Sequence, residues 1–290
     1  MRRDLEFETS SGNFHYIDWG GDGPLAHICH ANGFCAGTYE PLAERLATRL
    51  RVLGLDQRGH GRTTAAADPR RLKDWSLFAR DLERFFEGLG RPVAAIGHSL
   101  GGVVSLMTAV RRPDLVRALV LVDPTILPPS WMWWWRLAKI FGLARRIPIA
   151  AKAARRREYW PDRETMLRAF RGRGIFRTWQ DGFLEGYVNE GALENPDGSI
   201  RLACRPAWEA GCFASCIHDS WDYVRRLKVP TLLIFGTRSD TFLPPARKFF
   251  RKVLPEAVCV GLEDATHFAP MDQPDQTART ILEFLGRHGI

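Results

Sequence analysis

Cysteine is scarce in the sequence. Its six cysteines form no C-x-x-C pair, and neither a zinc-finger spacing nor an H-E-x-x-H motif occurs in the 290 residues. We therefore interpret the cysteines as buried apolar side chains and expect neither a metal nor another cofactor. A chain of this length buries about three quarters of its unfolded surface on folding, so its core needs no such support.

Long apolar runs are also missing. The longest stretch without Asp, Glu, Lys or Arg, 92–110, contains Pro92, His98 and several glycines, so it is not typical of a membrane span. The N-terminal MRRDLEFETSSGNF continues into acidic and polar residues where a secretory signal would have an apolar stretch. We therefore expect a soluble protein in the cytoplasm.

Positive charge is concentrated in one part of the chain. Residues 136–177 contain 13 Lys/Arg and 3 Asp/Glu, a net charge of +10, whereas the whole chain carries +8. Such a segment can attract an anionic membrane surface or an acidic substrate, or can be a solvated helical face. No nucleic-acid-binding motif accompanies it, so we expect no nucleic-acid partner. The oligomeric state is left open.

Short β-branched segments alternate with segments of helical periodicity in the first 125 residues and again after residue 230. This alternation is typical of βαβ units, so we predict an α/β fold with a doubly wound, mostly parallel sheet. A segment rich in proline, tryptophan and arginine lies between the two parts. We predict a core domain from 1–125 and 223–290, interrupted by an insertion at 126–222. The expected strands are 14–19, 25–29, 51–55, 92–97, 117–122, 230–236 and 257–261, and the expected helices are 38–50, 76–88, 244–254 and 274–286.

A serine follows the 92–97 strand in a setting typical of a nucleophile. The apolar PVAAI leads into GHSLGG and then into a helical run, so Ser99 lies in a G-x-S-x-G motif between a strand and a helix. Gly97 and Gly101 permit a tight turn, because larger side chains there would collide with the strand and the helix. The start of the helix would offer N–H groups to an oxyanion. We therefore predict that Ser99 is a catalytic nucleophile.

A serine hydroxyl needs a base, and the base needs a carboxylate that fixes its tautomer and stabilises its charged form. Both residue types follow the last two expected strands. Asp240 lies in GTRSDTFLP after the 230–236 strand, and His267 lies in EDATHFAP after the 257–261 strand. We predict that these two residues complete a triad with Ser99.

Four separated motifs make the sequence resemble the α/β-hydrolase superfamily along nearly its whole length. They are HANGFCAGTYEPL at 30–42, DQRGHGRT at 56–63, GHSLGG, and the Asp/His pair. The order Ser, Asp, His is the one typical of that fold. The resemblance implies a core sheet of about eight strands, a helical cap formed by 126–222, and a substrate pocket between core and cap.

The resemblance also implies further site residues. The oxyanion hole would consist of the backbone N–H groups of Leu100 and Phe34, with Cys35 as an alternative to Phe34. Some members of the superfamily carry the acid at the position of Asp123, which is therefore the alternative to Asp240. Serine at residue 99 argues against the haloalkane dehalogenase and epoxide hydrolase branches, which use an aspartate nucleophile there.

Tryptophan is concentrated in the expected cap, where eight of the ten occur, four of them in WMWWW. If 131–144 is helical, Trp133, Ile140 and Phe141 lie on one side and basic residues on another. We expect the apolar side to pack on the core. We also expect His98, Trp133, Trp134 and Phe268 to contribute to a pocket for a hydrophobic substrate. The alternative is weak contact of this basic, Trp-rich helix with a membrane surface.

Three classes of function fit these residues. The first is a serine esterase, similar to lipases, that cleaves carboxylic esters of a hydrophobic small molecule through an acyl-enzyme on Ser99. The second comprises thioesterase, lactonase and carbon–carbon bond hydrolase activities, which use the same triad. The third is a non-catalytic protein that binds a lipid or another ligand. An intact Ser, Asp and His set favours an enzyme.

Overall fold

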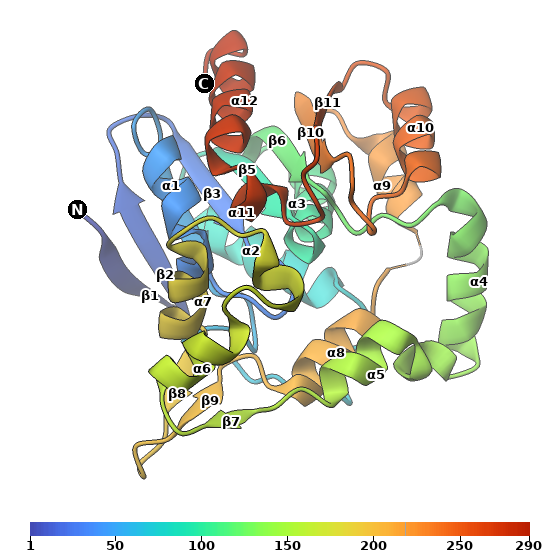
Figure 1. Ribbon diagram of the computed structural model, residues 1–290. Coiled ribbons are helices and arrows are strands. Elements are labelled where there is room, and N and C mark those ends of the chain that lie inside the picture. The colour runs from blue at the N-terminus through green and yellow to red at the C-terminus, as the bar shows by residue number, and fades with distance from the viewer. Residues whose placement is uncertain (218) are drawn as a thin grey trace.

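The computed structural model describes residues 1–217 and 219–290, and its centre is an eight-stranded sheet (Figure 1). The strand order is β1-β2-β4-β3-β5-β6-β10-β11. The pairs β1·β2 and β2·β4 are antiparallel and the other five are parallel, so the predicted α/β fold with a mostly parallel sheet is confirmed. The strands are β1 (Arg3–Thr9), β2 (Gly12–Gly20), β3 (Leu25–Cys29), β4 (Arg51–Leu55), β5 (Val93–His98), β6 (Val116–Val122), β10 (Thr231–Gly236) and β11 (Val258–Leu262).

Strand β1 is the one strand of this sheet that the sequence did not predict. It lies at the edge of the sheet and carries charged residues from Arg3 to Glu8. Charged side chains are common on edge strands, where they discourage pairing with other chains. The central strands have the opposite character, because β3, β5 and β10 are buried along their whole length.

Helices cover both faces of the sheet and separate two hydrophobic clusters. One cluster contains Phe85, Val103 and Phe250, which come from α2, α3 and α10. The other contains Leu42 and Ile281, which come from α1 and α12. Strands that are covered on both faces have nearly continuous apolar sequences, which is why these strands were predictable. The core helices are η1 (Ala36–Tyr39), α1 (Glu40–Leu46), α2 (Ser76–Leu89), α3 (Leu100–Arg111), α10 (Pro244–Val253), α11 (Ala269–Asp272) and α12 (Pro274–Arg287).

The inserted segment, residues 126–222, is not purely helical. It adds a small antiparallel sheet in the order β7-β9-β8, whose strands are too short to show an alternating pattern. Its last helix, α9, continues past residue 222 into the predicted core. The elements are α4 (Pro129–Ile140), η2 (Leu143–Arg146), α5 (Pro148–Ala154), β7 (Tyr159–Trp160), α6 (Arg163–Phe170), η3 (Gly174–Arg177), α7 (Phe183–Glu190), β8 (Ala192–Glu194), β9 (Ile200–Leu202), α8 (Pro206–Ala214) and α9 (Ser220–Arg226).

Tryptophan side chains fasten the inserted segment to the core. The indole N–H of Trp208 in α8 donates to the carbonyl of Arg58 at 2.9 Å. In the reverse direction, the indole of Trp75 in the core donates to the carbonyl of Cys212 at 2.9 Å. Buried indoles need such partners, so part of the tryptophan content is explained by packing. No helix among the described residues is long and apolar enough to cross a membrane.

Candidate active site

The turn between β5 and α3 holds Ser99 in a strained backbone conformation. Its φ of 56° and ψ of −118° lie outside the regions that L-residues usually adopt, and such strain is frequent at functional sites. A Cβ at Gly97 would collide with the carbonyl oxygen of Gly101. A Cβ at Gly101 would collide with the carbonyl oxygen of Cys29 at the end of β3. The two glycines of the motif are therefore required by the tight approach of strand, turn and helix.

Ser99, His267 and Asp123 form a continuous hydrogen-bonded series. The Oγ of Ser99 lies 3.0 Å from Nε2 of His267, and Nδ1 of His267 lies 2.8 Å from Oδ1 of Asp123. Since the carboxylate can only accept, Nδ1–H donates to Asp123 and Nε2 accepts the Ser99 proton. The Oγ of Thr125 lies 3.0 Å from the Ser99 oxygen and can donate to it. This arrangement can transfer a proton from the serine to the imidazole.

The acid beside His267 is Asp123, and the prediction of Asp240 for that place is corrected. Asp240 is exposed, and its Oδ1 accepts from the hydroxyl of Thr241 at 3.2 Å. The turn after β10 directs Ser239 inward and its neighbour Asp240 outward. The Ser239 hydroxyl donates to Oδ1 of Asp123 at 2.6 Å. The sequence pattern located the right turn, but the inward residue of that turn is the serine that supports the acid.

Asp123 follows β6, the strand that pairs with β10, and is completely buried. Besides His267 and Ser239, the N–H of Gly236 donates to its Oδ2 at 3.0 Å. Its φ is 42°, which is unusual for a residue other than glycine. Three donors around one buried carboxylate fix its direction.

His98, the residue before the nucleophile, links two loops of the site. Its Nε2–H donates to the carbonyl oxygen of His267 at 2.9 Å, and its Nδ1 accepts from the hydroxyl of Tyr39 at 2.6 Å. The Tyr39 oxygen in turn accepts from the N–H of Ala31 at 3.0 Å. Burial, together with the nearby His267, holds the pKa of His98 well below its usual range. Both ring nitrogens are occupied, so the expectation that His98 lines the pocket is corrected to a positioning role.

The two predicted oxyanion donors differ in their surroundings. The N–H of Leu100, at the start of α3, has no acceptor among the described residues. The N–H of Phe34 instead donates to the carbonyl of Ala31 at 3.3 Å and closes a turn. The alternative donor, the N–H of Cys35, points to the hydroxyl of Thr38 at 3.4 Å. The structure thus leaves the Leu100 N–H available and occupies both of the others.

Asn32 replaces Phe34 as the second candidate donor. In the loop after β3, the N–H of Gly33 donates to Nε2 of His60 at 3.1 Å, whereas the N–H of Asn32 has no acceptor in the described part of the chain. Burial lowers the pKa of His60 to about 3, so this ring is neutral and can accept. The change of two residues from Phe34 back to Asn32 could not be deduced from the motif, because it depends on which N–H groups already donate within the turn.

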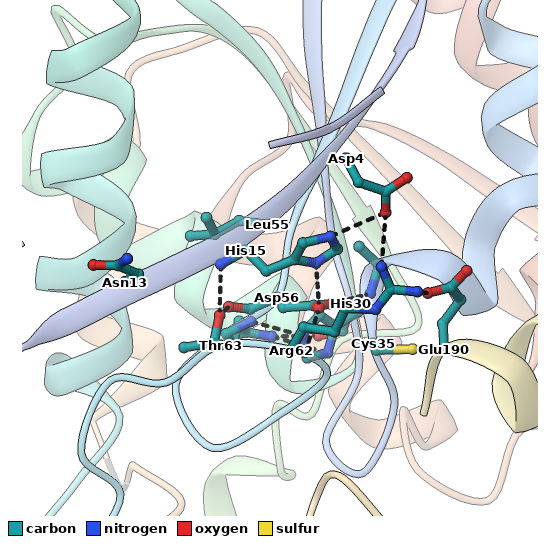
Figure 2. A network of polar contacts seen from close by, with 12 residues as sticks. Asp4, Asn13, His15, His30, Cys35, Leu55, Asp56, Arg62, Thr63 and Glu190 are labelled. Carbon is teal, nitrogen blue, oxygen red and sulfur yellow. Dashed lines mark hydrogen bonds and ion pairs between the residues drawn. The ribbon is translucent and has the colours of Figure 1, made fainter. Parts of the chain in front are cut away.

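A buried carboxylate holds the other end of this loop. Figure 2 shows Asp56 accepting from Nδ1 of His15 at 2.7 Å and from the N–H of Arg62 at 2.9 Å. It also accepts from the N–H of Ala36, the first residue of η1, at 2.7 Å. Although burial opposes the charged forms, this pairing lowers the pKa of Asp56 and raises that of His15. The DQRGHGRT motif therefore fixes the loop that carries Asn32.

An aromatic cluster adjoins His267. Phe268 packs against Phe34, with ring centroids 6.0 Å apart, and against Trp179 of the inserted segment, at 5.7 Å. That Phe268 contributes to a substrate pocket stays a prediction. Trp133 and Trp134 are instead 60% and 67% exposed on α4, so their expected place in a pocket at Ser99 is wrong. Trp179 was missed because one tryptophan among eight in the segment has no distinguishing spacing.

An ion pair from the inserted segment lies against the loop that carries Asn32 and Gly33. Arg156 donates to Oε2 of Glu209 at 2.7 Å and to the hydroxyl of Tyr187 at 2.5 Å. Gly33 has a φ of 82°, which favours glycine, and a Cβ there would lie 2.7 Å from Oε1 of Glu209. Burial raises the pKa of Glu209 in spite of the Arg156 charge. Nothing in the sequence pattern singled out this pair.

No group of three or more His, Cys, Asp and Glu side chains in 1–217 and 219–290 is arranged to hold a metal ion.

The fold and the Ser99 turn together define a hydrolase of the α/β type, and comparison with known proteins agrees. The sequence profile described as the alpha/beta hydrolase family matches residues 28–280. The match covers most of the chain, and the protein therefore belongs to that family. The resemblance stated from the four motifs is confirmed, and so is the general assignment as a hydrolase.

Relatives whose names indicate different activities are similar to this protein over the whole chain or over part of it. A haloalkane dehalogenase 2 from Mycobacterium tuberculosis is 27% identical over 286 residues, covering 97% of this chain and 94% of that protein. A human monoglyceride lipase is 32% identical over 109 residues, or 36% of this chain and 35% of that protein. The crystal structure of an E-2-(acetamidomethylene)succinate hydrolase has a TM-score of 0.79 at 22% identity, covering 99% and 100% of the two chains. That last likeness concerns the fold.

Proposed function

We propose that the protein hydrolyses carboxylic esters of a hydrophobic small molecule through an acyl-enzyme on Ser99. One observation carries this proposal: the hydrogen-bonded series from Ser99 through His267 to Asp123, at 3.0 and 2.8 Å. A serine, a base and a buried acid in this geometry are the elements of nucleophilic acyl transfer. Asp123, rather than Asp240, is the acid in this proposal. A cytoplasmic location stays a prediction.

The first half of the reaction forms the acyl-enzyme. Ser99 Oγ attacks the ester carbonyl carbon while His267 Nε2 takes the hydroxyl proton. Asp123 holds Nδ1–H and stabilises the imidazolium that results. When the tetrahedral intermediate collapses, the imidazolium gives its proton to the leaving alcohol. Water then attacks the acyl-enzyme with the same base, which releases the acid and restores Ser99.

Backbone N–H groups would stabilise the negative oxygen of each tetrahedral intermediate. The candidates are those of Leu100, at the N-terminus of α3, and Asn32, because neither has an acceptor among the described residues. A donor of this kind contributes about 3 kcal/mol to stabilisation of the transition state. Thr125, beside the Ser99 oxygen, would orient the hydroxyl before attack.

The proposed substrate class follows from the residues around the nucleophile. Serine at the turn favours acyl transfer over dehalogenation, which the resemblance associates with an aspartate at this position. Phe34, Phe268 and Trp179 place aromatic surface next to His267, which suits an apolar acyl or alcohol group. The similarity to a human monoglyceride lipase supports an ester substrate. We propose that the inserted segment, which contributes Trp179, acts as the cap over this site.

Hydrolysis of p-nitrophenyl esters, from acetate to palmitate, tests this proposal when wild type and Ser99→Ala are assayed side by side. We expect turnover in the wild type, a maximum at one chain length that reports the size of the aromatic site, and loss of turnover in the variant. Equal turnover in the two proteins would contradict the proposal.

Thioesters, lactones and carbon–carbon bonds are the alternatives if no ester is cleaved. A fluorophosphonate probe separates those alternatives from a protein that only binds a ligand. Labelling of Ser99 without ester turnover would mean a competent nucleophile with another substrate. Absence of both would favour a binding protein.

A further inference from the structure

Helix α4 carries its apolar side chains on the outside of the molecule. Trp133, Trp134, Ile140 and Phe141 are 60%, 67%, 66% and 70% exposed. These residues recur at three-, four- and seven-residue intervals with Leu137, so they form one stripe along the helix. The sequence predicted that Trp133, Ile140 and Phe141 would pack on the core, and this prediction is wrong.

The opposite side of α4 faces the protein through a few specific contacts. Met132 is buried there, and the indole of Trp135 and the ammonium of Lys139 both donate to the carbonyl of Cys216, at 2.8 and 3.2 Å. These contacts fix the rotation of the helix, so the exposed stripe is not explained by a helix that is free to turn. In Figure 1 the helix stands at the edge of the molecule, at the start of the inserted segment.

The stretch of chain that carries the stripe is basic and contains no acidic residue. Residues 124–157 include eight Lys/Arg and neither Asp nor Glu. Of these, Arg136, Arg146, Lys152 and Arg155 are exposed, and no carboxylate of the described residues lies within 4.0 Å of them. Most of the large apolar side chains that the described structure exposes lie in the same stretch, namely Trp131, Trp133, Trp134, Ile140, Phe141, Leu143 and Ile149.

We propose that α4 and the following basic residues form a docking surface for an anionic lipid membrane. Tryptophan and phenylalanine enter the headgroup region readily, and unpaired Arg and Lys are attracted to anionic lipids. A second copy of the chain is a poor occupant, because a symmetric contact would bring two basic surfaces together. Membrane docking does not depend on the proposed ester hydrolysis, since it uses no residue of the Ser99 site.

The test is sedimentation with vesicles of phosphatidylcholine, alone or containing one third phosphatidylglycerol, using full-length Ser99→Ala so that no lipid is cleaved. We expect binding at least about tenfold tighter to the anionic vesicles, weakened by salt. Trp133→Ala with Trp134→Ala and Phe141→Ala should reduce this binding at least about tenfold. Exposed side chains contribute little to folding, so the unfolding temperature of this variant should match that of the parent.

Charge is tested with a matched pair of triple variants. Arg136→Gln, Arg146→Gln and Lys152→Gln should weaken binding to the anionic vesicles by about tenfold or more. The control, Lys248→Gln, Lys252→Gln and Arg287→Gln, makes the same charge change on exposed residues of the core and should stay within about twofold.

Equal binding of all variants, or no binding of the parent to either vesicle, would overturn the proposal. Sedimentation velocity adds one more outcome. A dimer of the parent that is lost in the aromatic variant would assign the stripe to self-association and would also overturn it.

Discussion

The core and the inserted segment use tryptophan and charge in opposite ways. Trp75 in the core is 2% exposed and hydrogen-bonded, whereas Trp133 in the inserted segment is 60% exposed. Buried ion pairs in the core, such as Asp56 with His15, hold the loops of the site. Around α4, the exposed Arg136, Arg146, Lys152 and Arg155 have no acidic partner within 4.0 Å among the described residues. The core thus carries the side chains of the Ser99 site, whereas the inserted segment exposes apolar and basic side chains at the surface.

The largest expected effects come from replacing Ser99 or His267, the two core residues between which the proton moves. Ser99→Ala and His267→Ala should each lower kcat by about 10⁵-fold or more, because residues of a triad act as a unit. Ester hydrolysis under saturating substrate measures this loss, and circular dichroism verifies the fold. The same loss should follow from both changes together. Ordinary activity in either single variant would contradict the proposed nucleophile and base.

Asp123 and Asp240 form a matched pair for the acid. Asp123→Asn should lower kcat by about 10⁴-fold, by analogy with serine proteases, because the amide favours the wrong tautomer of His267. Asp240→Asn should change kcat by no more than about twofold, since Asp240 is exposed and does not contact His267. Measured kcat values for both variants decide the assignment. The reverse ranking would restore Asp240.

Replacing Trp75 or Trp133 by alanine compares what a core tryptophan and an exposed tryptophan contribute to the free energy of unfolding. Trp75→Ala should lower the free energy of unfolding by about 3–5 kcal/mol, because it leaves a cavity and removes the hydrogen bond from the indole to the carbonyl of Cys212. Trp133→Ala should change it by less than about 0.5 kcal/mol. Urea denaturation followed by circular dichroism measures both values. A large loss in the Trp133 variant would mean that α4 packs inward in solution.

We expect the protein to lose folding stability in acid because of buried histidines in the core. Burial lowers the pKa of His27 and His60 to about 3 and holds that of His98 well below its usual range. Below the unfolded-state pKa of about 6.5 these groups take up protons only on unfolding, so each costs about 1.4 kcal/mol of stability per pH unit as the pH falls. The raised pKa of His15 works in the opposite direction and offsets part of the loss.

Denaturant midpoints at pH 7 and pH 5.5 test this sign, and we expect the lower midpoint at pH 5.5. A midpoint that rises on acidification would mean that His15 outweighs the buried histidines whose pKa is lowered.

The smallest effect is expected for Tyr39→Phe, which removes the hydroxyl between His98 and Ala31. Because His98 then loses a partner, the carbonyl of His267 is held less firmly, and kcat should fall about tenfold with KM changed by less than about twofold. Tyr159→Phe, at an exposed tyrosine of the inserted segment, is the control and should leave both constants unchanged. A change in KM alone would contradict a positioning role for Tyr39.

The sequence predicted the core well because its patterns are set by burial. Strands covered on both faces, such as β5, have continuous apolar runs, and the glycines around Ser99 are required by backbone contacts. The partner of His267 was not predictable, since Asp123 and Asp240 both follow a strand and only the turn decides which side chain points inward. The orientation of α4 escaped prediction for a related reason. An amphipathic pattern shows which residues share a side, but not whether that side faces the core or the solvent.

Fluorophosphonate labelling, read by intact mass and peptide mapping, tests the central claim most directly. We expect one label on Ser99 in the wild type and in Asp240→Asn, none in Ser99→Ala, and labelling slowed by orders of magnitude in Asp123→Asn. A label that persists in Ser99→Ala, or equal labelling rates in the two aspartate variants, would contradict a nucleophile activated through His267 and Asp123.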